Sequence, residues 1–388
     1  MSTETVSGAA ATGPTTVAAR PRRGYIDWLR GLAVVIMIEA HTIDSWTETA
    51  WRGTLIFWYH QLLAGWAAPI FLFCAGLAVA LAAGGKARRA SSSSSPTPDA
   101  AFSAAKSMMW RGLQIWGLAL LFRVQAWLLS PGATVYGILK VDILNVMGPA
   151  ITAAALVWGL GARASSRPLV RIVALSAAAA VFSLLTPLVR ASTALAMLPD
   201  PIEWYFRPWP GRTTFTFFPW AGFVFAGAAA GSIIDAIRDA RNEVSVNVKI
   251  GIAGLAIFAA SLGGSFLPSI YAQSAFWTSS PSFFFLRIGV LLMLLTVACL
   301  WGQRRNADRF SPLKQFGRTS LFVYWIHVEM VYGILSYPLH RNLSLPAAVV
   351  AFALFTLAMF GLSMLKTRLV KRVSPGAKPG LTPAVTAP

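Results

Sequence analysis

Long apolar segments alternate with short polar ones along this chain. Each apolar segment holds about 20 residues, enough for a helix to cross the roughly 30 Å hydrocarbon core of a bilayer. The pattern predicts ten spanning helices, at about residues 26–45, 55–83, 107–129, 138–160, 168–188, 215–236, 247–268, 282–302, 315–336 and 344–366. The expected fold class is therefore all-α, a polytopic membrane protein with about ten transmembrane helices in one bundle.

The composition agrees with this pattern and leaves few residues for polar segments outside the membrane. Of 388 residues, 56% are hydrophobic and 12% are charged, against about 25% charged in soluble domains. We expect one membrane domain over 25–368, between disordered cytoplasmic tails at 1–24 and 369–388. Residues 84–106, which include "GGKARRASSSSSPTPDAAF", are expected to form a flexible cytoplasmic loop.

The net charge of +19 would suggest a nucleic-acid partner in a soluble protein, but its distribution points to a lipid bilayer instead. Basic residues concentrate in alternate loops, around 20–23, 86–111, 163–171, 238–249, 304–318 and 366–372. This pattern is typical of the positive-inside rule. It predicts an even number of spans with both termini in the cytoplasm, in a multi-pass membrane protein.

The first predicted helix carries ionisable residues that a spanning helix normally avoids, since each costs on the order of 3 kcal/mol near the bilayer centre. At 100° per residue, Arg30 and His41 lie within about 20° of one face, and Asp27 lies about 40° from His41. Arg30 and His41 are roughly 16 Å apart along the axis. Asp44 follows His41 by three residues. A neutral imidazole on this stripe is suited to act as a base or a nucleophile.

Other polar residues are predicted to gather in the outer half of the bundle. They are Arg123, Asp142, Asn145, Trp220, Arg287, His327 and Glu329. A cavity there would keep them away from lipid. The two cysteines lie inside predicted spans, and no metal-ligand spacing is present, so we expect no metal site.

Structural roles compete with chemical ones for several of these residues. Asp27 either caps the first helix or faces a substrate. Arg123 and Arg287 either extend to the outer headgroups or line a site. Glu39 and His60 are expected to bond neighbouring helices. The outer segment "PDPIEWYFRPWPGRTTF" suits either a sugar or an interfacial aromatic belt.

Five segments resemble, in order, a family of transmembrane acyltransferases. "YIDWLRGLAVVIMIEAH" is similar to the first helix of the bacterial heparan-α-glucosaminide N-acetyltransferase catalytic-domain family, in which an arginine precedes a histidine by eleven positions, as Arg30 precedes His41. "APIFLFCAGLAVALA" resembles its second helix, and "VDILNVMGPA" resembles its "GVLQRIG" motif with Asn145 in place of glutamine. "FFPWAGFVFAGAAAG" and "FGRTSLFVYWIHVEMVYG" resemble its later motifs, and the last includes His327. The resemblance covers about residues 22 to 345.

The resemblance implies transfer of an acetyl or other short acyl group from cytoplasmic acyl-CoA to a carbohydrate or glycoconjugate at the outer face. His41, Asp44 and His327 would then be catalytic, and acetyl-CoA would be the donor. The substrate-binding residues would be Arg30, Asp27, Arg123, Asp142, Asn145, Trp220 and Arg287. Among these, Arg123, Asn145 and Arg287 are alternative donors to an oxyanion. His41 would act as a base or hold the acyl group itself.

Two other functions use the same polar residues. A transporter or flippase of a polar or glycan-like solute would use the cavity for permeation, although such proteins favour broken helices and inverted repeats. In a structural subunit, the polar stripe would only join helices. Turnover of acyl-CoA by the purified protein distinguishes an acyltransferase from both.

Overall fold

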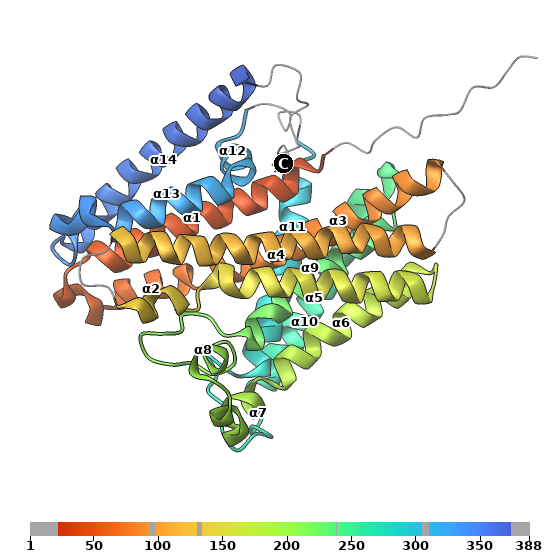
Figure 1. Cartoon of the computed structure of the whole chain (residues 1–388), viewed down its shortest axis with the longest axis horizontal. Coiled ribbons are helices and arrows are strands. Elements are labelled where there is room, and N and C mark those ends of the chain that lie inside the picture. The colour runs from red at the N-terminus through yellow and green to blue at the C-terminus, as the bar shows by residue number, and fades with distance from the viewer. Residues whose placement is uncertain (1–21, 94–97, 130–133, 238, 305–309, 374–388) are drawn as a thin grey trace, which may run out of the picture.

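A computed structural model describes residues 22–93, 98–129, 134–237, 239–304 and 310–373, and these residues are largely helical (Figure 1). The long helices are α1 (Gly24–Trp46), α3 (Ala67–Ser93), α4 (Pro98–Leu129), α5 (Ile143–Ala164), α6 (Pro168–Leu184), α9 (Phe217–Asp235), α10 (Glu243–Gly264), α11 (Pro281–Trp301) and α14 (Leu345–Val373). Shorter α-helices are α2 (Leu55–Ala64), α7 (Thr186–Ala191), α8 (Asp200–Glu203), α12 (Pro312–Arg318) and α13 (Ser320–Tyr332). The 3-10 turns are η1 (Thr49–Gly53), η2 (Val135–Leu139), η3 (Thr193–Met197), η4 (Ala240–Asn242) and η5 (Ile334–Leu339).

The chain is an all-α, polytopic membrane protein, as predicted. Within the described ranges, eight helical stretches are long and apolar enough to cross a membrane. They are Leu55–Ala90, Asp99–Leu129, Ile143–Ala164, Pro168–Ala191, Phe217–Asp235, Glu243–Gly264, Pro281–Trp301 and Leu345–Val373.

Two of the ten expected spans are not long and apolar enough to be among these eight, and each has a physical reason. Helix α1 is 23 residues long, but its ionisable residues reduce its hydropathy. The expected span at 315–336 is divided into α12 and α13 at Thr319, whose φ of −113° and ψ of 15° interrupt the helix. The two segments that depart from a simple apolar span are therefore the ones that carry His41 and His327.

Glycines let several helices pack with their backbones in contact. A Cβ added at Gly76 of α3 would lie 1.9 Å from the Val224 carbonyl oxygen of α9, and one at Gly227 would lie 2.0 Å from the Phe73 oxygen. Small residues allow such an approach between membrane helices. Gly231, one turn beyond Gly227, packs in the same way, because a Cβ there would lie 2.9 Å from the Leu77 oxygen.

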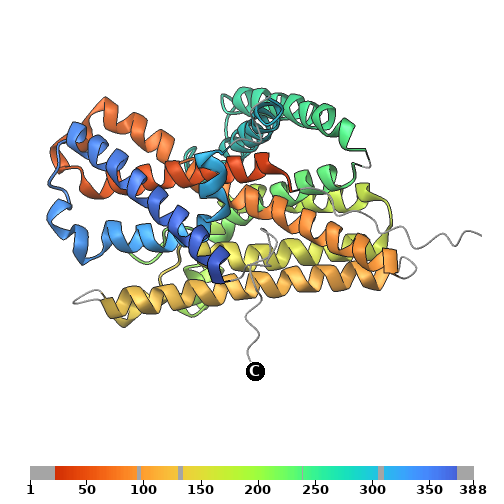
Figure 2. The same ribbon diagram turned by 90° about the horizontal axis from the view of Figure 1, so that it is seen from above.

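Successive spans run in opposite directions, so the bundle has two ends. We call the end where α1 begins the basic end, since it holds Arg22, Arg23, Arg88, Arg163, Arg171, Lys314 and Arg318. We call the end where α1 finishes the loop end, and it holds η1, η2, α8 and η5. Helix α4 runs along the long axis of the molecule, and α1 and α13 lie roughly parallel to it over part of that length (Figure 1); α4 packs beside α5 (Figure 2).

The predicted loop at 84–106 is wrong over most of its length. Helix α3 continues to Ser93 and α4 begins at Pro98, so only 94–97 lie outside the described residues. Alanine and arginine favour helix, and Arg88 ties the extension of α3 to Asp235 of α9 at 2.7 Å. The ordered structure extends into both segments that were predicted to be disordered tails. Arg23 bonds Glu243 at 2.7 Å, and α14 extends to Val373. Residues 1–21 and 374–388 lie outside the described ranges.

Candidate active site

A cavity of about 900 Å³ runs through the bundle between α1, α3, α4, α5 and α13. The residues that line it include Arg30, Met37, His41, Ala64, Ala67, Ala68, Phe71, Ala75, Ala78, Ala82, Met108, Arg111, Ile115, Phe122, Arg123, Lys140, Asp142, Ile143, Met147, Ile151, Phe215, Ser320, Tyr324, Val328, Glu329 and Tyr332. The α3 wall consists mostly of alanine at three- and four-residue spacing, one face of a helix. Their short side chains leave the space that the cavity occupies.

Charged side chains line the cavity at both ends. Arg30 and Arg111 lie toward the basic end, while Arg123, Lys140 and Asp142 lie toward the loop end, and His41 lies in the loop half. The shared face of Arg30 and His41 predicted from helical periodicity is confirmed, because both line this one cavity. The wall between the charged ends is largely apolar, which is typical of small-molecule sites.

His41 pairs with His327 across α1 and α13. Nδ1 of His41 lies 2.8 Å from Nε2 of His327. The rings are parallel within 6°, with centroids 5.0 Å apart. The two nearly parallel ring planes can be at most 2.8 Å apart, since that is the distance between one atom of each ring. The centroids are 5.0 Å apart, so the rings are displaced sideways and lie edge to edge, not face to face. The contact is therefore an in-plane hydrogen bond.

The partners of His327 define which nitrogen of His41 is available. His327 is fully buried, and its Nδ1 lies 2.9 Å from the Val323 carbonyl oxygen. A carbonyl only accepts, so Nδ1 of neutral His327 carries the proton and Nε2 accepts from Nδ1–H of His41. In this assignment Nε2 of His41 keeps its lone pair, which is the requirement for a general base.

Two tyrosines that contact the histidine pair were not predicted as site residues. Tyr332 lies edge-on to His41, with ring centroids 5.5 Å apart, and Tyr324 contacts His327 at 5.8 Å. Glu329 lines the cavity, and within the described residues its Oε1 is buried without a hydrogen-bond partner. The sequence did carry a signal: Ser320, Tyr324, Val328 and Tyr332 recur every four residues, on one helical face.

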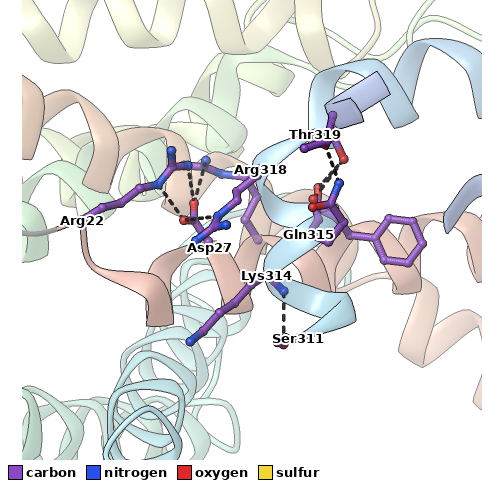
Figure 3. Close-up of polar contacts among 10 residues, drawn as sticks. Arg22, Asp27, Ser311, Lys314, Gln315, Arg318 and Thr319 are labelled. Atoms are coloured by element: carbon purple, nitrogen blue, oxygen red, sulfur yellow. Dashed lines mark hydrogen bonds and ion pairs between the residues drawn. The ribbon is translucent and has the colours of Figure 1, made fainter. Parts of the chain in front are cut away.

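Asp27 does not line the cavity, contrary to its predicted substrate-binding place. It is 3% exposed and accepts two hydrogen bonds from Arg22, at 2.7 and 2.8 Å. Arg318 lies 3.7 Å and Arg30 3.9 Å from the same carboxylate. Figure 3 shows Arg22 and Arg318 converging on it. Asp27 thus fixes Arg30 and the start of α1 through ion pairs.

Asp44 was predicted to act with His41, but it faces Arg52. The two side chains are 3.2 Å apart, and Arg52 also donates to the Asp44 carbonyl. Asp44 is not among the residues that line the cavity. The ring partner of His41 is His327 and not the aspartate three residues away, because α13 brings a closer acceptor.

Asp142 and Asn145 start α5 as a capping box. The Asp142 carboxylate accepts from the backbone N–H groups of Leu144 and Asn145, at 3.0 and 3.2 Å, and Asn145 is 1% exposed. Such reciprocal bonds satisfy the free donors of a helix start. Asp142 also lines the cavity, whereas Asn145 does not, so the observed role of Asn145 is to cap the helix.

Arg123 is the predicted oxyanion donor that reaches the cavity. It donates to the Gly137 carbonyl at 2.9 Å and lies 4.0 Å from Asp142. Burial raises the pKa of Asp142, against the lowering effect of the Asn145 N–H and of Arg123. Burial, and then the charge of Arg123, lowers the pKa of Lys140. These groups form a polar cluster of mixed charge at the loop end.

Trp220 and Arg287 form a separate aromatic cluster. The Arg287 guanidinium lies 4.1 Å from the ring centre of Phe283, 5.9 Å from Trp220 and 6.0 Å from Trp66. Neither residue lines the cavity, so the structure places them apart from Arg30 and His41, and their contact with substrate stays a prediction. Cation–π contacts of this kind hold an arginine in a low-dielectric site.

His60 and Glu39 join neighbouring helices, as predicted, with Nδ1 of His60 2.6 Å from Oε1 of Glu39.

Within the described residues, no group of three or more His, Cys, Asp or Glu side chains is placed to hold a metal ion.

A comparison with known protein families identifies the family to which this chain is similar. The heparan-alpha-glucosaminide N-acetyltransferase catalytic family matches residues 22–265. This range includes Arg30, His41, Arg123 and Asp142, whereas His327 lies beyond it. A search of curated proteins gives no match. The family match covers well over half of the chain and agrees with the motifs of its first helices. The chain belongs to the family defined by the heparan-alpha-glucosaminide N-acetyltransferase catalytic domain.

Proposed function

We propose that this protein is an integral-membrane acyltransferase that moves an acetyl or other short acyl group from acyl-CoA to a carbohydrate or glycoconjugate. The donor enters from the cytoplasm at the basic end, and the acceptor reaches the loop end from outside. The protein lies in a bacterial inner membrane with both termini in the cytoplasm. The family and the positive-inside pattern support this orientation.

One observation carries the proposal: His41, which is hydrogen-bonded to His327, lines a cavity that Arg30 and Arg111 also line. A coenzyme A donor has phosphates at one end and a thioester at the other, joined by a long thin arm. Arginines bind phosphate through charge-assisted hydrogen bonds. The axial separation of Arg30 and His41, roughly 16 Å, suits the two ends of such a donor.

The chemical step follows from the free lone pair on His41. Nε2 of His41 removes a proton from the acceptor hydroxyl or amine as its oxygen or nitrogen attacks the thioester carbonyl. A bond forms between acceptor and acyl carbon, the carbon–sulfur bond breaks, and the coenzyme thiolate takes the proton back from His41. The protein adds no net proton or electron. His327 holds the His41 ring in orientation and accepts its Nδ1–H.

The groups around His41 match the remaining needs of acyl transfer. A thioester oxygen gains negative charge in the transition state, and a donor fixed nearby lowers the barrier. Arg123 is the predicted donor that lines the cavity. Glu329, with an unpartnered buried oxygen, and Asp142 offer acceptors for sugar hydroxyls at the loop end.

Purified protein in detergent or nanodiscs tests this function with isotopically labelled acetyl-CoA and a panel of glycans. We expect label to pass to an acceptor, or to water, and we expect His41→Ala to lower the rate of this transfer by about 10²–10⁴. His340→Gln is the matched control, because His340 lies near the same end, bonds the Val331 carbonyl at 2.9 Å and does not line the cavity. Absence of turnover in wild-type protein that transports a glycan-like solute into liposomes would favour a transporter instead.

A further inference from the structure

Tyr324 of α13 brings a phenol hydroxyl to the large cavity beside the histidine pair. Its side chain lines the cavity, and its ring meets that of His327 edge-on, with centroids 5.8 Å apart. Among the described residues, none forms a hydrogen bond with this hydroxyl. By contrast, the hydroxyl of Tyr25 donates to Glu243 at 2.7 Å. Tyr324 therefore has an O–H group that is available to a molecule in the cavity.

The position of Tyr324 along α13 places it on the donor's side of the histidines. It precedes His327 by three residues, which is roughly 4.5 Å nearer to the basic end at 1.5 Å per residue. Arg30, which is proposed to hold the donor phosphate, lines the same cavity toward that end. A donor that extends from Arg30 to His41 therefore runs along the wall that contains Tyr324.

Neighbouring rings hold Tyr324 in a fixed orientation. The buried ring of Phe122 on α4 lies 5.9 Å from it, centroid to centroid. His327 lies against another part of the ring and is itself fixed, because it bonds both the Val323 carbonyl and His41. A donor that is held in place before the reaction stabilises developing charge without the cost of reorientation.

Arg123, the other candidate donor to the thioester oxygen, is already engaged. Its Nε and one terminal nitrogen both donate to the Gly137 carbonyl, at 3.1 and 2.9 Å. Its other terminal nitrogen lies 4.0 Å from the Asp142 carboxylate. Arg123 would have to give up part of these contacts in order to reach a substrate, whereas Tyr324 would not.

We propose that Tyr324 is a catalytic residue, whose hydroxyl donates a hydrogen bond to the carbonyl oxygen of the donor thioester. This inference rests on the acyl transfer proposed above and assigns the oxyanion donor of that site. As the acceptor attacks, the carbonyl π electrons move onto oxygen, and they return when the carbon–sulfur bond breaks. The phenol proton stays on Tyr324 throughout, so His41 remains the group that transfers a proton.

Steady-state kinetics of the purified protein test this role with Tyr324→Phe, which removes the hydroxyl and keeps the ring. We expect kcat for acetyl transfer to fall by about 10²–10³, the effect typical of one oxyanion donor. The KM for acetyl-CoA should change little, because the bond strengthens as charge develops. Tyr337→Phe is the matched control, since Tyr337 is 75% exposed near the loop end and does not line the cavity. A kcat of Tyr324→Phe close to that of wild type overturns the proposal.

Infrared difference spectroscopy tests the contact without turnover. Acetyl-CoA labelled at the carbonyl carbon is bound to His41→Ala protein, and we expect its carbonyl stretch to move to lower frequency than in solution. Adding Tyr324→Phe should remove this shift, and an unchanged frequency in that double variant overturns the proposal. A shift that depends on Tyr324 without any transfer of label refutes acyl transfer but supports the contact. Transfer that His41→Ala lowers and Tyr324→Phe leaves unchanged refutes the role of Tyr324 alone.

Discussion

His41 and His327 lie 286 positions apart in the sequence, yet their ring nitrogens are 2.8 Å apart. The contact joins α1 to α13, the two elements that are least like ordinary apolar spans. Nδ1–H of His327 donates to the Val323 carbonyl, and Nε2 of His327 accepts from Nδ1–H of His41. Nε2 of His41 therefore keeps its lone pair. The predictions below treat the pair as one base with an orienting partner.

Replacement of His41 by alanine removes the proposed proton-transfer group. We expect kcat to fall by about 10²–10⁴, the contribution typical of a positioned general base, while donor binding measured by calorimetry persists. Near-normal turnover by folded His41→Ala protein would show that the histidine joins helices and performs no chemistry.

His327 is predicted to support the site without transferring the proton. Glutamine at this position retains an oxygen that can accept from Nδ1–H of His41, whereas alanine leaves that N–H unpaired. We therefore expect His327→Gln to keep measurable activity and His327→Ala to lose more, with neither reaching the loss in His41→Ala. The comparison uses kcat of all three variants at matched expression. A complete loss in His327→Gln would contradict this order.

Arg30 is predicted to bind donor phosphate. Arg30→Ala should raise the KM for acyl-CoA by roughly tenfold to a hundredfold, the loss of one or two charged hydrogen bonds, with a smaller effect on kcat. Arg30→Lys should recover part of the loss, because a point charge still attracts phosphate. Unchanged donor affinity in Arg30→Ala would leave Arg30 as a structural partner of Asp27.

The orientation of the bundle is open to a direct measurement. Reporter fusions after residues 90, 165 and 240 should all report the cytoplasm, since these positions lie at the basic end. A periplasmic signal at any one of the three would invert or break the topology.

Gly317 is predicted to be required for the contact of α12 with α1. A Cβ there would lie 1.8 Å from the Asp27 carbonyl oxygen, so Gly317→Ala must displace a backbone and should cost about 1–3 kcal/mol or more of stability. Gly361→Ala on α14 is the control, since nothing lies within 4 Å of its added Cβ. Thermal unfolding in detergent should show a lower transition for Gly317→Ala alone.

Much of the architecture is determined by local sequence. Apolar length defines the spans because a bilayer leaves a backbone no partner except its own helix. Helical periodicity is sufficient to place Arg30 and His41 on one face, and the cavity confirms it. That Glu39 and His60 each bond a neighbouring helix also follows from the cost of an unpartnered polar group in lipid, whereas their pairing with each other is seen only in the structure.

The partner of each polar group was decided only by tertiary packing. Asp44 is close to His41 in sequence but faces Arg52, and Asn145 closes a capping box in place of facing the cavity. The division of the expected ninth span at Thr319, together with the backbone contact at Gly317, sets where α13 lies against α1. That placement brings His327 to His41. Helical periodicity gives the angle of a side chain about its own axis, whereas the distance between two helices depends on how every intervening side chain packs.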